Sequence, residues 1–189
     1  MYRGTVMIGM SGGVDSSVAA LQLLEQGWDC IGVTMKLYDG PDTGGCCSLA
    51  DVEDAQSVCR RLGIPHYTFD MTREFKRYVM DPFVSEYEAG RTPNPCIACN
   101  RQMKFRLLWQ RAKELDCTHL ATGHYARIRE LDGHLRLESA LDETKDQTYV
   151  LWFLTEEQLA RTIFPLGGLT KSQVREIAKS HGFVNAGKK

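Results

Sequence analysis

The stretch TVMIGMSGGVDSSVAALQLLEQG, residues 5–27, joins a short apolar run to a glycine-rich loop and then to an amphipathic segment. The run 5–10 is typical of a buried strand, and the apolar side chains beyond the loop recur at helical spacing until Gly27. The alternation continues, with strand patterns at 29–37, 66–70 and 118–122 and helix patterns at 48–62, 73–89 and 100–116. It predicts an α/β fold, a doubly wound parallel sheet with helices on both faces in three α/β/α layers.

Three further segments lie outside this alternation. Residues 90–100, GRTPNPCIACN, are predicted to be irregular because two prolines flank one asparagine. Residues 126–140 predict a hairpin with an Asp-Gly turn, and residues 170–182 predict an amphipathic helix. Ser48 and Asn100 are expected to cap the helices that begin beside them.

The composition is that of one globular domain, with 189 residues, 43% hydrophobic and 25% charged. The net charge is −1, so a nucleic-acid site would have to be a local basic patch. No apolar run approaches the length of a membrane span, and the first residues do not form a signal peptide. Seven cysteines without such a signal favour a reducing compartment. We therefore expect a cytoplasmic protein or, in a eukaryote, one of an organelle matrix.

The loop Ser11–Ser16 follows a strand and opens a helix, which is the setting of a phosphate-binding loop. Its glycines let the backbone approach an anion, and the helix start supplies N–H donors and a positive dipole. The loop lacks the lysine of G-x-x-x-x-G-K-[ST], and a phosphate would repel Asp15 unless a cation such as Mg²⁺ bridged them. These features favour holding the pyrophosphate that leaves during an adenylation. The structural alternative is a strand-to-helix turn capped by Asp15 and Ser16.

Ligands of doubly wound sheets bind beyond the carboxyl ends of the strands. Three segments of this sequence are expected at that edge: residues 11–16, the loop after Thr34–Leu37, and residues 122–126. The sequence therefore predicts a single site at this edge.

The pair Cys96 and Cys99 forms a CxxC motif with three ordinary interpretations: a redox pair, half of a metal site, or a catalytic thiol. Two small buried hydrophobic side chains are the structural alternative. Cys99 immediately precedes the expected cap Asn100, so amides and dipole at that helix start should favour its thiolate. No second CxxC exists in the sequence, which excludes a closed four-cysteine zinc site of that type.

The other cysteines, the histidines and one basic cluster are less informative. Cys46-Cys47 are either redox-active or incidental, whereas core positions are expected for Cys30, Cys59 and Cys117. His124 abuts the predicted site, and structural or surface roles are expected for His66, His119, His134 and His181. A solvated helix face is favoured over phosphate contacts for Arg101, Lys104, Arg106 and Arg111.

Five segments occur in one order along nearly the whole chain: GMSGGVDSSVAA, GCCSLADVEDAQSVCRRLGIPHYTFD, FVSEYEAGRTPNPCIACN, LATGHYAR and KDQTYVLWFL. Together they resemble the tRNA-specific 2-thiouridylase family of PP-loop ATP pyrophosphatases. Members of that family replace oxygen by sulfur at position 2 of the wobble uridine of tRNA.

The resemblance implies a role for each matching residue. ATP would be bound by Gly9, Met10, Ser11, Gly12, Gly13, Val14, Asp15, Ser16, Met35 and Gly123. The target base and tRNA would contact Asn94, Pro95, Cys96, His124, Lys145, Asp146 and Gln147. Cys99 would be the nucleophile and Asp15 a further catalytic residue. The implied cofactors are ATP and Mg²⁺, the implied partners are tRNA and a persulfide sulfur donor protein, and no membrane is involved.

The resemblance also implies a domain division and an open question about sulfur. Residues 1–165 would form the PP-loop catalytic domain and 166–189 the start of a central domain, with the family's C-terminal β-barrel absent. Members carry a persulfide cysteine in a D-S-x-x-I-C-F type segment beyond GFVNAGKK, so this chain is expected to bind ATP but to lack that carrier. With that downstream cysteine, Cys96 and Cys99 would serve a persulfide relay that leaves a disulfide or releases hydrosulfide. Alternatively, the same three cysteines would hold a [4Fe–4S] cluster with one open iron.

Two other functions remain open. The chain would act either as an ATP- and tRNA-binding fragment without complete sulfur transfer, or as another PP-loop adenylating ligase.

Overall fold

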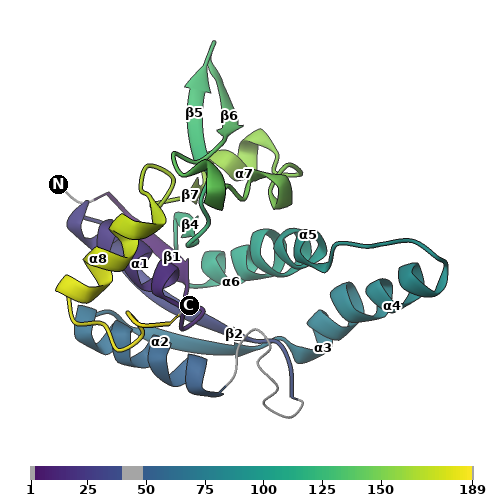
Figure 1. Cartoon of the computed structure of the whole chain (residues 1–189), viewed down its shortest axis with the longest axis horizontal. Coiled ribbons are helices and arrows are strands. Elements are labelled where there is room, and N and C mark those ends of the chain that lie inside the picture. Colours follow the sequence, from purple (N-terminus) through teal and green to yellow (C-terminus); the bar gives the residue numbers. More distant parts are fainter. Residues whose placement is uncertain (1–2, 40–48, 189) are drawn as a thin grey trace.

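The structure, a computed structural model, describes residues 3–39 and 49–188 (Figure 1). Its centre is a parallel sheet with the strand order β3-β2-β1-β4-β7. The strands are β1 (Thr5–Gly9), β2 (Asp29–Lys36), β3 (His66–Asp70), β4 (His119–Ala121) and β7 (Thr162–Ile163). The strand order reverses between β1 and β4, and such a switch point is where a ligand crevice is expected.

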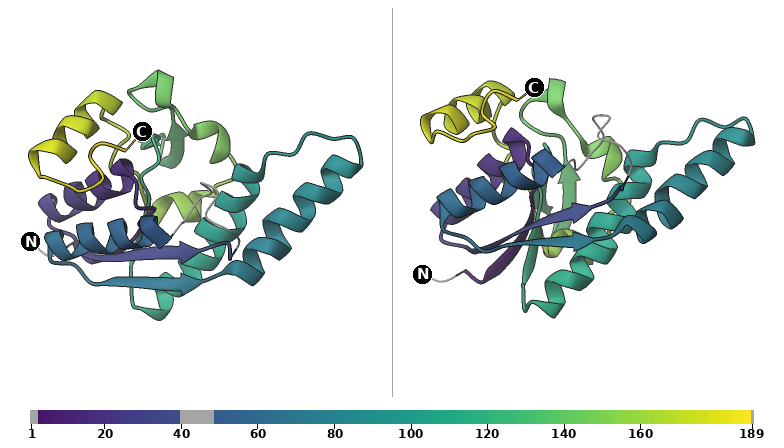
Figure 2. Two further views of the ribbon diagram at one scale, coloured as in Figure 1. Left: turned by 60° about the horizontal axis from the view of Figure 1, so that its bottom comes forward. Right: turned by 90° about the horizontal axis from the view of Figure 1, so that it is seen from below.

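Helices cover both faces of this sheet (Figure 2). One face carries α1 (Val14–Glu25), α2 (Leu49–Leu62) and α8 (Lys171–Ser180), and the other carries α5 (Pro95–Ala98), η2 (Cys99–Leu108) and α6 (Trp109–Glu114). Alternate side chains of β1 serve the two cores, with Val6 and Ile8 packed on the side of α1 and Met7 on the side of η2. The predicted doubly wound, three-layer α/β/α fold is confirmed.

The core contains the cysteines that the sequence assigned to it. Cys30, Cys59 and Cys117 are buried, and burial raises the pKa of the Cys59 thiol to about 12. These thiols are therefore packing groups. Cys46, Cys47 and the expected cap Ser48 lie outside the described residues.

Two projections leave the body (Figure 1). The predicted helix 73–89 is present as α3 (Thr72–Phe75), η1 (Lys76–Met80) and α4 (Asp81–Glu88). The predicted hairpin is confirmed as β5 (Arg127–Leu131) and β6 (His134–Glu138), with Asp132-Gly133 between them. Two short 3-10 helices, η3 (Glu143–Lys145) and η4 (Thr148–Val150), and the short α-helix α7 (Glu156–Ala160) follow the hairpin.

The prediction that residues 90–100 are irregular is wrong beyond Asn94, because the helix begins at Pro95. Proline fits the first helical position, where its missing N–H has no partner to lose. The Asn94 side chain caps this helix, accepting from the N–H groups of Cys96 at 3.0 Å and Ile97 at 3.4 Å. Asn100 is not a cap but lies inside the helix, where its Nδ2 donates to the Val150 carbonyl at 3.3 Å.

Residues 166–188 pack against α1, the helix that follows the glycine-rich loop. Val174, Ala178 and Phe183 are buried in the core that α1 shares. The predicted helix 170–182 is present as α8, which Thr170 opens through a capping box with Gln173. The proposed domain boundary at residue 165 stays a prediction.

None of the helices in the described ranges has the length and apolar character that crossing a bilayer requires.

Candidate functional site

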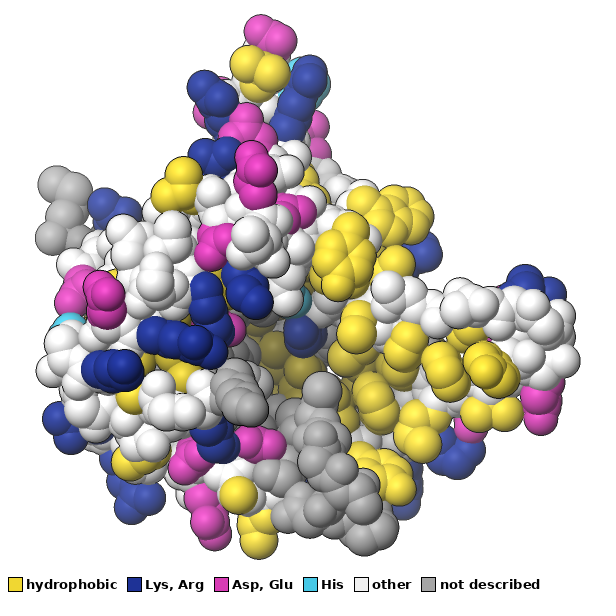
Figure 3. All heavy atoms as spheres, in the orientation of Figure 1, with side chains coloured by type: hydrophobic (Ala, Val, Ile, Leu, Met, Phe, Trp, Pro, Cys, Tyr) yellow, Lys and Arg dark blue, Asp and Glu magenta, His cyan; other side chains and the backbone are white. Residues whose placement is uncertain are grey.

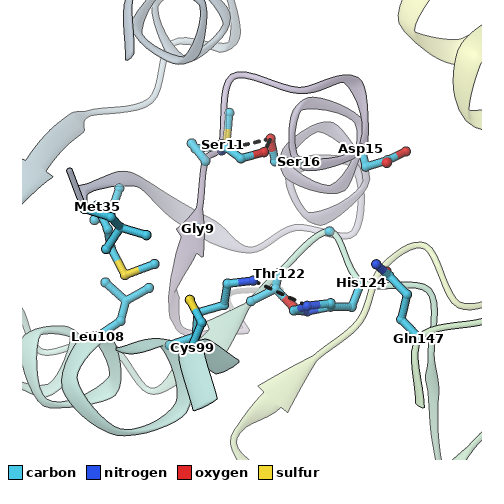
Figure 4. A pocket seen from close by; sticks show the side chains of 15 residues that line it. Gly9, Ser11, Asp15, Ser16, Met35, Cys99, Leu108, Thr122, His124 and Gln147 are labelled. Carbon is cyan, nitrogen blue, oxygen red and sulfur yellow. Dashed lines mark hydrogen bonds between the residues drawn. The ribbon is translucent and has the colours of Figure 1, made fainter. Parts of the chain in front are cut away.

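A cavity of about 280 Å³ lies where β1, β2 and β4 end (Figure 4). It is lined by Gly9, Met10, Ser11, Asp15, Ser16, Val33, Met35, Leu37, Cys99, Lys104, Leu108, Thr122, Gly123, His124 and Gln147. Figure 3 shows the same face hollowed between the body and the projecting helices, with basic and apolar side chains around the hollow. The structure therefore joins the three sheet-end segments that the sequence placed together.

The loop is held in shape by its own hydroxyl groups. The Oγ of Ser16 accepts from the N–H of Ser11 at 3.2 Å and donates to the Gly13 carbonyl at 3.1 Å, and Ser17 donates to the same carbonyl. Gly13 is the N-cap of α1 and provides no side-chain cap. The amides of the first turn of α1 are thus available to an anion in the cavity.

Gly12 and Gly123 permit the close packing around this loop. Gly12 has φ of +72°, and a Cβ built there would stand 2.3 Å from the carbonyl oxygen of Asp51. A Cβ on Gly123 would stand 2.9 Å from the amide nitrogen of Ser16. The end of β4 therefore lies directly against the first turn of α1.

Cys99 points into this cavity from the opposite side, below Ser11 and beside Leu108 (Figure 4). The helix that carries Cys99 begins at Pro95, one turn earlier. The prediction that the amides of a helix start favour the Cys99 thiolate is therefore wrong. The amides of that start belong to Cys96 and Ile97, and Asn94 already accepts from them. Cys96 is exposed and is not among the side chains that line the cavity.

The Asn94 cap gives a first testable expectation. Asn94→Ala should lower the free energy of unfolding by about 1 kcal/mol, because two amides of the helix that carries Cys99 lose their acceptor. Urea unfolding of the two proteins measures this difference. Asn94→Asp keeps the acceptor and should stay within about 0.5 kcal/mol of wild type, so equal losses in both variants would contradict the capping role.

His124 is buried and neutral in this cavity. Its Nε2 lies 3.4 Å from the ammonium of Lys104, and its Nδ1 lies 2.7 Å from the Thr122 hydroxyl oxygen. Because an ammonium can only donate, Nε2 accepts and Nδ1 carries the proton. Burial, and secondarily the charge of Lys104, holds the pKa of His124 well below its usual value.

The lowered pKa of His124 predicts a loss of stability in mild acid. Above pH 6.5 the ring is neutral in the folded and unfolded chain, whereas below about pH 6.5 only the unfolded chain gains the proton. The free energy of unfolding should therefore fall by up to about 1.4 kcal/mol per pH unit from this group. Urea titrations from pH 7.5 to 5 measure the slope.

His124→Gln should remove that contribution, and His134→Gln is the matched control because His134 is exposed on the hairpin. A His124→Gln slope equal to that of wild type would show that the ring takes up its proton in the folded chain.

The two oxygens of Asp15 contact groups that the sequence did not place here. Lys171 Nζ lies 2.6 Å from Oδ1 and 2.7 Å from Oδ2, and the Tyr125 hydroxyl donates to Oδ1 at 2.8 Å. Burial, followed by the hydrogen bond to Asp15, raises the pKa of Tyr125, which keeps this donor protonated.

The residues expected at tRNA separate into three groups. His124 and Gln147 line the cavity, and Gln147 Oε1 accepts from the Tyr125 amide at 2.9 Å. Asp146 instead holds its own loop, accepting from the Ala140 amide at 2.8 Å. Exposed positions away from the lining are occupied by Asn94, Pro95, Cys96 and Lys145.

The predicted basic helix face is divided in the structure. Arg106 donates to Gln102 and covers the Tyr78 ring, and Arg111 pairs with Glu114. Lys104 turns the other way and lines the cavity, which the sequence prediction missed.

The described residues do not by themselves form a metal cage, since they contain no group of three His, Cys, Asp or Glu side chains placed to hold an ion. Cys96 and Cys99 alone supply two thiols, fewer than an iron–sulfur cluster requires. Mg²⁺ makes a different demand, because it is commonly held by one or two carboxylates and by the phosphates of its nucleotide. Asp15 is a carboxylate of the lining, but both of its oxygens already contact the ammonium of Lys171.

Similar proteins identify the family. The model described as tRNA methyl transferase HUP domain matches residues 4–189. The tRNA-specific 2-thiouridylase MnmA of Clostridium perfringens is 53% identical over 187 residues, covering 96% of this chain and 52% of the relative. The protein of that name from Bacillus licheniformis is 51% identical, with coverages of 97% and 50%. The chain therefore spans about half the length of the curated relatives it matches, and the predicted resemblance to this family is confirmed.

Solved structures share the fold at low identity. A 4-thiouridine synthetase in complex with RNA and bound ATP has a TM-score of 0.69 at 22% identity, covering 98% of this chain and 42% of that protein. The U34-tRNA thiolase NcsA of Methanococcus maripaludis, with its [4Fe-4S] cluster, has a TM-score of 0.60 at 22% identity, covering 97% and 58%. By its sequence over residues 4–189, the chain belongs to the tRNA methyl transferase HUP-domain family.

Proposed function

We propose that this chain activates the wobble uridine of tRNA for 2-thiolation, with ATP as the activating cofactor. The observation that carries this proposal is the position of Cys99, which lines the same cavity as the phosphate-type loop Ser11–Ser16. An adenylating ligase needs the loop but has no use for a thiol opposite it. The name of the relatives, tRNA-specific 2-thiouridylase, supports the same chemistry.

The first step is adenylation of the position-2 oxygen. The uracil carbonyl is a poor electrophile and has to be activated before sulfur can attack it. Its oxygen attacks the α-phosphorus of ATP, pyrophosphate leaves, and the oxygen becomes part of an AMP leaving group. The first-turn amides of α1 stabilise the charge that develops on the departing pyrophosphate. Because the cavity lies among buried elements, the base has to leave its stack to enter, as in other base-modifying enzymes.

Lys104 and His124 would act on the negative charge of the bound nucleotide. The ammonium of Lys104 lines the cavity and donates a hydrogen bond to Nε2 of the neutral His124 ring, which adds no second charge. Met35 and Gly123, at the ends of β2 and β4, form the adjoining wall, and the family resemblance implies that they contact ATP. Mg²⁺ would neutralise the phosphates and be held chiefly by them, since both oxygens of Asp15 contact Lys171.

The second step replaces oxygen by sulfur. The terminal sulfur of a cysteine persulfide on a donor attacks carbon 2, and AMP leaves with the former carbonyl oxygen. The thiolate of Cys99 then attacks the remaining S–S bond, which forms a disulfide with the donor cysteine and frees the thiocarbonyl. A [4Fe–4S] route through Cys96 and Cys99 is the alternative, and an absorbance spectrum of anaerobically purified protein distinguishes it.

The remaining predictions rest on the same proposal. The partners would be tRNA and a persulfide donor protein, and the location would be cytoplasmic. A chain that binds ATP and tRNA but does not complete sulfur transfer is the competing function, since it spans about half the length of its relatives.

The test incubates the chain with ATP, Mg²⁺, unmodified tRNA and a persulfide donor, and measures pyrophosphate and thiolated tRNA separately. The proposal predicts pyrophosphate release that depends on tRNA, together with thiolated product. Pyrophosphate without thiolation would leave adenylation standing and reject sulfur transfer by this chain. Absence of ATP binding would reject the proposal as a whole.

A further inference from the structure

The phosphate-type loop lacks a lysine in its own sequence, but a lysine reaches it in space. Lys171 is separated from Asp15 by 156 positions, yet its Nζ lies 2.6 and 2.7 Å from the two carboxylate oxygens. Asp15 stands in the first turn of α1 and lines the cavity. Lys171 is therefore paired with a carboxylate of the cavity lining, although it is not itself a lining residue.

Several contacts fix the lysine in this place. Its backbone N–H donates to Asp142 Oδ2 at 2.9 Å, and Thr170 caps the helix that it begins. Its Nζ lies 5.9 Å from the centroid of the Tyr125 ring, whose hydroxyl donates to the same carboxylate. The side chain of Lys171 is 20% exposed and that of Asp15 is 34% exposed. The pair is thus built into the fold and partly shielded from solvent.

The charge arrangement explains why a phosphate loop can contain an aspartate. An unpaired carboxylate in the first turn of α1 would cancel part of the attraction that the helix start exerts on an anion. Lys171 neutralises it. Among the described residues the two Asp15 oxygens are the acceptors of this ammonium, so its positive charge lies against this carboxylate.

We propose that Lys171 is the positioning residue for the triphosphate at this loop: it neutralises Asp15, so that the first-turn amides of α1 can attract the phosphates. This inference rests on the proposed binding of ATP. In a site where Asp15 acts chiefly as a magnesium ligand, loss of the lysine would not affect how the carboxylate acts on phosphate. Under this inference, Asp15 repels phosphate as soon as Lys171 is removed.

A double-mutant cycle separates the two roles. Titration calorimetry in Mg²⁺ would measure ATP affinity for wild type, Lys171→Met, Asp15→Asn and the double variant. Lys171→Met should weaken ATP binding at least about tenfold, because it leaves the carboxylate unpaired beside the phosphates. The double variant should recover most of that loss, since no unpaired charge remains. AMP, which lacks the outer phosphates, should bind wild type and Lys171→Met within about threefold of each other.

Lys179→Met is the matched control, because Lys179 is exposed on the same helix and its loss should leave ATP affinity unchanged. Lys171→Arg keeps the charge and should retain most of the affinity. If Lys171→Met does not fold, the double variant still tests the idea, since a tenfold or greater loss of ATP affinity in it would contradict neutralisation as the role of the lysine.

Inorganic pyrophosphate as a second probe separates this inference from the proposed function. Binding of pyrophosphate that depends on Lys171, without binding of ATP, would support the lysine's role and reject the ATP proposal. Binding of ATP that is unchanged in Lys171→Met, or an Asp15→Asn loss that Lys171→Met does not alter, would overturn the inference and leave the ATP proposal intact. If wild type binds neither probe, both fall.

Discussion

Gly12→Ala is expected to weaken ATP binding by at least about 100-fold, which corresponds to about 2.7 kcal/mol. Two causes act together. Gly12 has φ of +72°, a conformation that costs an alanine about 1 kcal/mol, and its new methyl group would stand 2.3 Å from a backbone oxygen of Asp51. Because the Asp51 backbone belongs to α2 and cannot move without that helix, the loop around residue 12 has to shift instead. Titration calorimetry measures the affinity, and thermal unfolding shows whether the fold survives.

Gly13→Ala is the matched control for this experiment. Gly13 has φ of −89°, and a methyl group there would stand 3.4 Å from Ser11 Oγ, a side-chain atom that can adjust. Its ATP affinity should stay within about threefold of wild type, a difference under 1 kcal/mol. Equal affinities for ATP in wild type and Gly12→Ala would mean that the nucleotide does not use this loop.

Cys99→Ser is expected to reduce thiolated tRNA at least about 1000-fold, because an alcohol cannot replace a thiolate as the sulfur-attacking group. The adenylation step uses the loop and not the thiol, so tRNA-dependent pyrophosphate release should fall by less than about threefold. The two products are measured in one reaction with a persulfide donor. Equal losses of both products would place Cys99 in the first step.

Cys96→Ser separates the persulfide route from the cluster route. Cys96 is exposed and lies outside the cavity lining, so the persulfide route predicts thiolation within about tenfold of wild type. An iron–sulfur site would need both thiols, and the two serine variants would then be equally inactive. That second outcome would reject Cys99 acting alone.

The fold could be predicted because its signals are local. The alternation of strand and helix patterns from residue 5 onward determines a doubly wound sheet, and the loop after β1 is placed by that topology at the strand ends. Met35, Gly123 and His124 could be placed for the same reason. Met35 lies near the end of β2, and Gly123 and His124 follow β4 closely, so their distances from the loop depend on the sheet alone.

The features of the site that the sequence did not predict depend on contacts between distant segments, on helix packing, or on the cap of the helix that begins at Pro95. Lys171 reaches Asp15 across 156 positions, and no periodicity in either segment indicates it. Lys104 shares a helix with Arg106 and Arg111, and only the packing of that helix turns it into the cavity. The predicted helix start is too late because proline usually breaks a helix, whereas Pro95 at the first helical position after Asn94 is itself a start signal.

The most direct test follows the oxygen atom that adenylation would transfer. A tRNA whose wobble uridine carries ¹⁸O at position 2 is incubated with the chain, ATP, Mg²⁺ and hydrosulfide as the smallest sulfur nucleophile, and the AMP formed is analysed by mass spectrometry. Attack of hydrosulfide on carbon 2 expels AMP together with the labelled oxygen, so we expect one ¹⁸O in each AMP that accompanies a thiolated uridine. Thiolated uridine accompanied by unlabelled AMP would contradict activation of the position-2 oxygen.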